Sequence, residues 1–176
     1  MSQLFTRNRL LGLALAALIY VVDQWIKYHV TWTLKLPEKG KIDLLPFFDL
    51  TWVENYGVSL GMLTAQSMEM RWGLVALTSL IALVVFVWIL REKAFGDILG
   101  LSLVLGGAAG NIDDRMNFGY VVDYADFHIG DFRPFLVFNL ADAAITIGVL
   151  IILARSFLIR EKAEQKSDAG APVTEN

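Results

Sequence analysis

Cysteine is absent from this chain of 176 residues, and histidine occurs only twice, at His29 and His128. Without cysteine there is no disulfide framework, no thiolate nucleophile and no thiolate metal site. The two histidines lie far apart and form no HExxH-like pair, so we do not expect a histidine-built zinc site. The formal net charge of −3 is too small to indicate nucleic acid or another strongly charged partner.

Long apolar runs are the dominant feature of the sequence. The composition is 56% hydrophobic, and the mean hydropathy is +0.53, which together indicate a membrane protein. A helix needs roughly 20 mainly apolar residues to cross a bilayer. We predict four such spans, over about residues 10–29, 70–90, 95–112 and 134–157.

The predicted fold class is therefore an integral membrane protein, mainly α-helical, with four transmembrane helices. We expect one four-span domain over residues 1–160. The charged, small-residue-rich segment 161–176 is expected to be a disordered cytoplasmic tail.

The segment between the first two spans indicates β structure. Prolines, a glycine and recurring charges interrupt residues 30–66, which therefore do not form a span. Residues 47–53 are aromatic, β-branched and partly alternating, as in a strand. We expect a small extracytoplasmic β-platform over about residues 33–64.

Aromatic side chains mark two places where the chain should lie at the membrane surface. Trp32 and Trp52 are expected at head-group level beside the platform. Residues 116–134 mix aromatic and charged side chains, which predicts an interfacial segment between the third and fourth spans.

The distribution of lysine and arginine gives the orientation of the spans. Eight such residues fall on the side of the termini and seven on the other side, so the raw count barely discriminates. Arg7, Arg9, Arg91 and Lys93, however, lie directly beside span ends, where positive charge favours the cytoplasm. We therefore expect cytoplasmic termini in a multi-pass protein, with the platform at the outer face.

Carboxylate and amide side chains, with one arginine, are concentrated between residues 106 and 142, at the ends of apolar runs. Ionisable groups at membrane depth are costly, so such a concentration predicts a functional site. The residues concerned are Asn111, Asp113, Asp114, Arg115, Asp123, Asp126, Asn139 and Asp142.

Asp123 and Asp142 are the candidate catalytic pair. Asp123 precedes the fourth span, and Asp142 is expected about eight residues inside it, so both should lie at one membrane face. Two close carboxylates do not both ionise easily, and one keeps its proton. The neutral group can protonate a carbonyl or leaving group while the ionised one takes a proton from water, as in aspartic proteases.

Several of these residues also have simpler interpretations. Asp23 and Lys27 are spaced i, i+4, which favours a neutralising ion pair near the membrane surface. Arg115 is expected to pair with Asp114. Considered without the rest of the sequence, Asp123 is expected to be an ordinary solvated loop residue. Three further groups also have structural alternatives: Asp113 and Asp126 as solvated or paired surface groups, and Asn139 as a helix–helix contact.

Five short motifs resemble the bacterial lipoprotein signal peptidases, the signal peptidase II family. They are Asp23-Gln24 with Lys27, Asn55-x-Gly57, GGAAGNIDDR at 106–115, VVDY at 121–124 and FNLAD at 138–142. Each motif is weak alone, but their order and spacing over about residues 20–145 are specific.

The resemblance implies an aspartic-type signal peptidase with Asp123 and Asp142 as its catalytic residues and without a metal or cofactor. It also implies that further positions bind substrate or support the site. These are Asp23, Asn55, Gly57, Gly107, Asn111, Asp114, Arg115, Asn139 and Ala141.

By the same resemblance, the substrate is a prolipoprotein that carries a diacylglyceryl group on a cysteine, and cleavage falls just before that cysteine. The expected location is the bacterial cytoplasmic (inner) membrane, with the active site near the outer face. The expected partners are this substrate and membrane lipids, with no nucleic acid, and we expect a monomer.

Two other classes of function share some of these features. A proton-coupled transporter would use Asp123 and Asp142 as relay sites, but the chain is short and has no repeated halves. A metal-dependent lipid phosphotransferase would place clustered aspartates on Mg²⁺. The spacing of the aspartates does not match such a motif.

Overall fold

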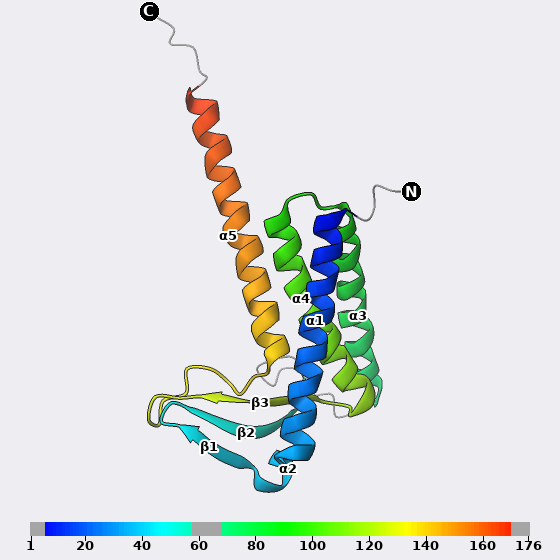
Figure 1. Cartoon of the computed structure of the whole chain (residues 1–176), viewed down its shortest axis with the longest axis vertical. Helices are drawn as coiled ribbons and strands as arrows, with labels where there is room; N and C mark the ends of the chain where they lie inside the picture. Colours follow the sequence, from blue (N-terminus) through cyan, green and yellow to red (C-terminus); the bar gives the residue numbers. More distant parts are fainter. Residues whose placement is uncertain (1–5, 58–67, 170–176) are drawn as a thin grey trace, which may run out of the picture.

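The computed structural model describes residues 6–57 and 68–169, and within them four helices are long and apolar enough to cross a membrane (Figure 1). The helices are α1 (Arg7–Tyr28), α3 (Met68–Arg91), α4 (Phe95–Asn117) and α5 (Leu140–Ala169). A π-helical turn, η1 (His29–Thr33), continues α1. The four predicted spans are thus confirmed.

The fourth span begins later than we predicted. The backbone of Phe138 pairs with that of Ala125 as an antiparallel bridge, with Ala125 N donating to Phe138 O at 2.7 Å. This extended pairing prevents the helix from starting near Pro134, and α5 begins at Leu140 instead. Asp142 consequently lies in the first turn of α5, not about eight residues inside the helix.

The far end of α5 also differs from the sequence-based expectation. The apolar part of the helix ends at Leu158, but the helix itself continues to Ala169. Residues 161–169, expected to be disordered, are therefore helical. Residues 170–176 lie outside the described part of the chain.

A three-stranded antiparallel sheet lies across one end of the helix bundle, in the order β1-β2-β3 (Figure 1). The strands are β1 (Lys41–Leu45), β2 (Phe48–Asn55) and β3 (Val121–Phe127), and a short helix α2 (Leu36–Lys39) precedes them. The predicted strand at 47–53 is β2. The third strand comes from the segment predicted as interfacial, and residues 58–64 of the expected platform are not described.

Packing between the sheet and the end of α1 attaches the platform to the membrane helices. A buried apolar cluster joins Val30 and Leu36 to Leu50 of β2 and to Val122 and Ala125 of β3. Because residues this well buried exclude water, the strand that carries Asp123 is held firmly against the bundle.

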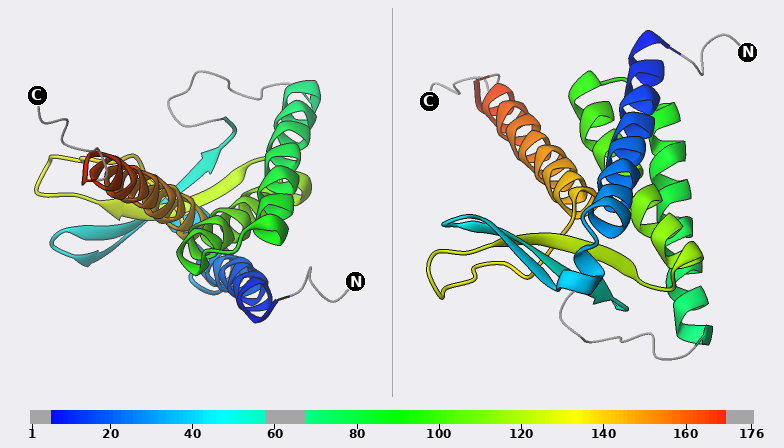
Figure 2. Two further views of the ribbon diagram at one scale, coloured as in Figure 1. Left: turned by 90° about the horizontal axis from the view of Figure 1, so that it is seen from above. Right: turned by 60° about the horizontal axis from the view of Figure 1, so that its bottom comes forward.

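Small residues let α4 occupy the centre of the bundle, where it contacts α1, α3 and α5 (Figure 2). A Cβ atom at Gly148 of α5 would lie 2.5 Å from the carbonyl oxygen of Gly100 of α4. A Cβ atom at Gly106 would lie 2.5 Å from the carbonyl oxygen of Ala16 of α1. Backbone contacts this close are typical of glycine-mediated packing in membranes.

Replacing Gly148 with alanine should lower the free energy of unfolding by about 1–3 kcal/mol, because the added methyl group meets backbone that cannot move aside. Gly73 of α3 is the matched control, since nothing lies within 4 Å of the point that a Cβ atom there would occupy. Gly73→Ala should leave stability unchanged or raise it by up to about 1 kcal/mol. Thermal unfolding in detergent would measure both, and equal effects would contradict the proposed close packing.

Candidate active site

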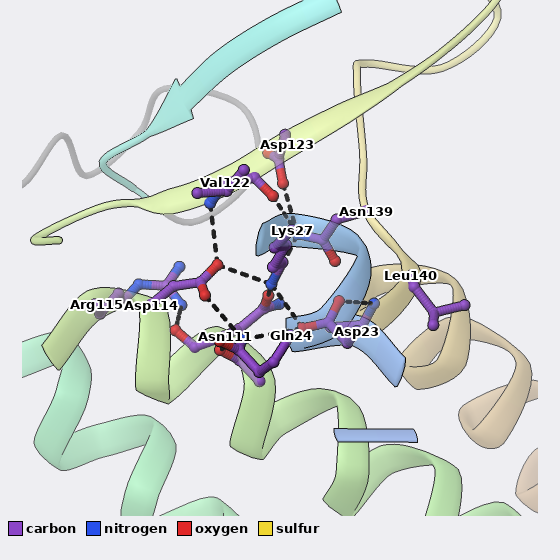
Figure 3. A network of polar contacts seen from close by, with 12 residues as sticks. Asp23, Gln24, Lys27, Asn111, Asp114, Arg115, Val122, Asp123, Asn139 and Leu140 are labelled. Atoms are coloured by element: carbon purple, nitrogen blue, oxygen red, sulfur yellow. Dashed lines mark hydrogen bonds and ion pairs between the residues drawn. The ribbon is translucent and has the colours of Figure 1, made fainter. Parts of the chain in front are cut away.

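Residues of α1, α4 and β3 and those at the start of α5 meet where the bundle reaches the sheet (Figure 3). At the centre of this network the ammonium group of Lys27 lies 2.8 Å from Asp23 Oδ2 and 2.7 Å from Asp114 Oδ2. All three side chains are at most 3% exposed. The predicted Asp23–Lys27 pair therefore exists, but it is buried and includes Asp114, which had been expected to pair with Arg115.

Each carboxylate beside Lys27 also accepts a backbone hydrogen bond from another element. Asp23 Oδ1 accepts from Ala141 N at 3.0 Å, in the first turn of α5. Asp114 Oδ2 accepts from Val122 N at 3.0 Å, on β3. The ion pairs on α1 and α4 thereby fix the two segments that carry Asp142 and Asp123.

Asn111 connects the ammonium group of Lys27 to Asp142. Its Oδ1 accepts from Lys27 Nζ at 3.3 Å, which leaves its amide nitrogen to donate to Asp142 Oδ1 at 2.8 Å. Since a lysine ammonium can only donate hydrogen bonds, Lys27 determines which way the Asn111 amide points.

Asn139 contacts both candidate catalytic carboxylates. Asp142 N donates to Asn139 Oδ1 at 2.9 Å, and Asn139 N donates to Asp142 Oδ2 at 3.3 Å. This reciprocal pair is the pattern of a capping box at the N-terminus of α5. The Asn139 amide nitrogen also donates to Asp123 Oδ1 at 2.6 Å.

Asp123 lies on β3 and is only 2% exposed. Besides the bond from Asn139, its Oδ2 accepts from Asn55 Nδ2 at 3.0 Å. Burial, followed by the negative charge of Asp142, raises the pKa of Asp123 to about 7. Asp123 is therefore a carboxyl group that can hold a proton near neutral pH.

Arg115 makes backbone contacts at the C-terminal end of α4. It donates to Gly57 O at 3.0 Å and to Asn111 O at 3.1 Å. Its Nε is buried and has no hydrogen-bond partner among the described residues. Arg71 of α3 in turn donates to the carbonyl oxygen of Arg115 at 2.7 Å, so this end of α4 is anchored from both sides.

A cavity of about 320 Å³ opens beside these groups. Asp142, Asn111, Arg115, Asn55 and Thr78 supply polar groups to its lining, and apolar side chains such as Ile81 and Ile145 supply most of the remainder. Asp123 does not line this cavity. The cavity thus offers both polar groups and apolar surface to a bound molecule.

All eleven site residues named from the sequence lie in or directly beside this network. Gly107 belongs to it through a backbone contact, because a Cβ atom there would meet the carbonyl oxygen of Ala141. Asp126 lies apart, is 3% exposed, and accepts from Arg133 at 3.2 Å and from Thr51 at 3.0 Å. Asp126 is therefore paired, as the sequence-based alternative stated, but it is buried and does not lie at the surface.

Lys27 and Gln24 contribute more than the sequence indicated. Gln24 donates to Asp114 Oδ1 at 2.9 Å and to the carbonyl oxygen of Gly110 at 3.3 Å. Both residues lie within one turn of Asp23 on a hydrophobic helix, where polar side chains are unusual. That position, together with the motif formed by Asp23-Gln24 and Lys27, was the sequence signal that pointed to them. Within residues 6–57 and 68–169, no group of three His, Cys, Asp or Glu residues is arranged to hold a metal ion.

Comparison with known proteins adds an independent observation. The family described as Signal peptidase (SPase) II matches residues 15–158. The lipoprotein signal peptidase of Sphingopyxis alaskensis is 55% identical over 154 residues, covering 88% of this chain and 89% of that protein. The lipoprotein signal peptidase of Rhizorhabdus wittichii is 56% identical, covering 88% and 90%.

Solved structures give a similar result. A bacterial membrane enzyme determined by the in meso method at 2.3 Å resolution superposes with a TM-score of 0.70 at 26% identity, covering 94% of this chain and 93% of that one. A second, at 1.9 Å resolution, has a TM-score of 0.69 at 28% identity, covering 82% and 90%.

Replacing Lys27 with methionine should lower the free energy of unfolding by about 3–5 kcal/mol, because two buried carboxylates lose their counter-ion. Lys35→Met is the control, since that ammonium group is 62% exposed and lies 3.9 Å from its partner. Its loss should cost at most about 1 kcal/mol. Thermal unfolding of both variants would test this, and equal destabilisation would contradict a central role for the Lys27 ion pairs.

The raised pKa of Asp123 predicts a pH-dependent stability. Below about pH 4 the group is protonated in both the folded and unfolded chains. Between that pH and about 7 only the folded chain keeps the proton, so this contribution to stability falls as pH rises, by no more than about 4 kcal/mol.

Infrared spectroscopy across this range should show a protonated carboxyl band that disappears near pH 7 and is absent in Asp123→Asn. In Asp142→Asn the band should disappear at a lower pH, because one cause of the raised pKa is removed. An unchanged midpoint in Asp142→Asn would show that the two carboxylates do not interact.

Proposed function

The chain belongs to the signal peptidase II family, and on that basis we propose that it is an intramembrane aspartic endopeptidase for lipid-modified prolipoproteins. Its substrate carries a diacylglyceryl group on a cysteine, and the cleaved peptide bond directly precedes that cysteine. The observation that most supports this proposal is Asn139, which donates one hydrogen bond to Asp123 and exchanges two with Asp142.

The two aspartates take different roles in this proposal. Asp123 is the acid, because a pKa of about 7 leaves it protonated over much of the neutral range. Asp142 is the base, held by the bond from Asn111 and located at the N-terminus of α5, where the helix dipole favours a negative charge. One proton shared between two carboxylates is the arrangement of aspartic proteases.

In the first step, Asp142 takes a proton from a water molecule, whose oxygen attacks the carbonyl carbon of the scissile peptide bond. Asp123 gives its proton to the carbonyl oxygen as the tetrahedral intermediate forms. In the second step, the proton held by Asp142 passes to the leaving nitrogen, the C–N bond breaks, and the hydroxyl proton returns to Asp123. The products are a signal peptide carboxylate and a new amino terminus on the lipid-modified cysteine.

The cavity beside Asp142 suits the signal peptide. Its lining combines apolar side chains with the polar groups of Asp142, Asn111, Arg115, Asn55 and Thr78, so a hydrophobic segment can enter with its scissile bond beside those polar groups. Asp123 is 2% exposed and does not line the cavity. Groups around Asp123 therefore have to move before this carboxyl group can reach the scissile bond.

The position of the site within the membrane fits this reaction. A substrate helix must unwind before its peptide bond can be attacked, and exposed backbone is costly in lipid. The junction between the helices and the sheet provides polar partners at this point. We further propose that the protein is a monomer in the bacterial inner membrane, with cytoplasmic termini and the site near the outer face.

Purified protein in detergent, supplied with a diacylglyceryl-modified prolipoprotein, should release the signal peptide both with and without EDTA. Asp123→Asn and Asp142→Asn should remain folded and lose activity by about 10²-fold or more, because each removes a proton-transfer group. Asp126→Asn is the matched control, since this buried aspartate of β3 lies outside the network and should retain activity.

Loss of cleavage in EDTA would require a metal in the mechanism and would overturn the dyad as the complete catalytic apparatus. Full activity in folded Asp123→Asn or Asp142→Asn would exclude that residue as catalytic. If folded wild-type protein never cleaves the substrate, the peptidase assignment itself is wrong.

A further inference from the structure

A second cavity, of about 340 Å³, lies on the platform away from the aspartates. Four aromatic side chains line it, and they come from the end of α1, from β2 and from the segment after α4. They are Trp32, Trp52, Phe118 and Tyr120. Tyr120 meets Trp52 edge-on at a ring-centroid distance of 6.5 Å and stacks on Phe118 at 6.1 Å.

Three charged groups share this cavity with the aromatic rings. Glu54 and Glu38 are carboxylates, and Lys35 is an ammonium group that is 62% exposed and weakly paired with Glu38 at 3.9 Å. Glu54 is held in place by the hydroxyl group of Tyr56, which donates to Glu54 Oε2 at 2.6 Å. Aromatic faces beside a fixed carboxylate favour a cation, and Lys35 supplies one site for an anion.

The backbone at Lys35 supports a role for its side chain. Lys35 has φ of +53° and ψ of +45°, and it is the only non-glycine residue in residues 6–57 and 68–169 with positive φ. A left-handed conformation costs roughly 1 kcal/mol for such a residue, and glycine would adopt it more cheaply. The lysine side chain is thus kept at the cavity despite this cost.

The cavity lies at the end of a lipid-facing stripe on α1. Leu18, Val21, Trp25, Tyr28 and Trp32 follow one another at helical spacing, and each is 57–60% exposed. The span from Arg7 to Thr33 is 27 residues, or roughly 40 Å, which reaches from one head-group region to the other. Trp32 therefore lies where an acyl chain along the stripe would meet its head group.

We propose that this cavity binds the head group of a zwitterionic phospholipid, with the ammonium group against the aromatic rings and Glu54, and the phosphate beside Lys35. One acyl chain follows the exposed stripe of α1. The aromatic rings, Glu54 and Lys35 are then accounted for by one ligand, and Glu38 is the partner of Lys35. This lipid site is separate from the proposed peptidase activity, and binding can be measured without cleavage.

The simpler alternative is an ordinary belt of interfacial aromatic residues without a preference for any head group. The two interpretations differ in what they predict for anionic lipid. A belt should retain phosphatidylethanolamine and phosphatidylglycerol equally, whereas the proposed site should prefer phosphatidylethanolamine because only its head group carries an ammonium group.

Native mass spectrometry of the full chain would test this, after exchange into an equimolar mixture of phosphatidylethanolamine and phosphatidylglycerol with identical acyl chains. Wild-type protein should retain phosphatidylethanolamine over phosphatidylglycerol by roughly fivefold or more. Trp32→Leu and Glu54→Gln should each lose most of this preference, the first by removing an aromatic face and the second by removing only a charge.

Trp88→Leu is the matched control, because Trp88 lies on α3, outside the stripe, is 47% exposed, and does not line the cavity. It should keep the wild-type preference. Lys35→Gln should reduce retention of both lipids, since both carry a phosphate. Equal retention of the two lipids by wild-type protein would overturn the proposal, and so would an unchanged preference in Glu54→Gln. If Trp32→Leu does not fold, Glu54→Gln alone still provides the test.

Discussion

The buried ammonium group of Lys27 is the constraint on which the rest of the structure depends. One cation between Asp23 and Asp114 joins α1 to α4 where both leave the apolar core. Those carboxylates extend the connection, one to the first turn of α5 and the other to β3. Removing two charges from water costs several kcal/mol per ion unless their geometry compensates. The arrangement therefore selects a particular relative position of helices and sheet more than it adds stability.

Two asparagines carry that constraint to the carboxylates proposed to act on substrate. Asn111 has its amide oriented by Lys27 and presents its nitrogen to Asp142. Asn139 starts α5 and donates to Asp123 on the neighbouring strand. A neutral amide can hold a carboxylate without compensating its charge. Asp123 and Asp142 can therefore interact electrostatically while each remains positioned by hydrogen bonds.

The sequence was sufficient for features that depend on local pattern and insufficient for those that depend on pairing. Long apolar runs identified four spans, and the aromatic alternation at 47–53 identified β2. The third strand was missed because Val121–Phe127 is specified by its partner β2 and by no periodicity of its own. The same long-range pairing, at Phe138, delays α5 to Leu140. The site residues were named largely through the motifs, while the Lys27–Asp114 contact arises from helix packing that spacing alone cannot give.

The difference between the two proposed catalytic groups follows from the elements that carry them. Asp142 is in the first turn of a helix, where the backbone N–H of Asn139 donates to its carboxylate. Asp123 is on a strand, away from any helix N-terminus, and among the described residues its carboxylate accepts hydrogen bonds only from the amide side chains of Asn55 and Asn139. Burial then acts on Asp123 without a compensating cation in contact, and its pKa rises to about 7. The helix and the strand thus give the two aspartates different surroundings before any substrate is present. This is the asymmetry that the proposed acid and base roles require, and a fold with both aspartates on helix N-termini would lack it.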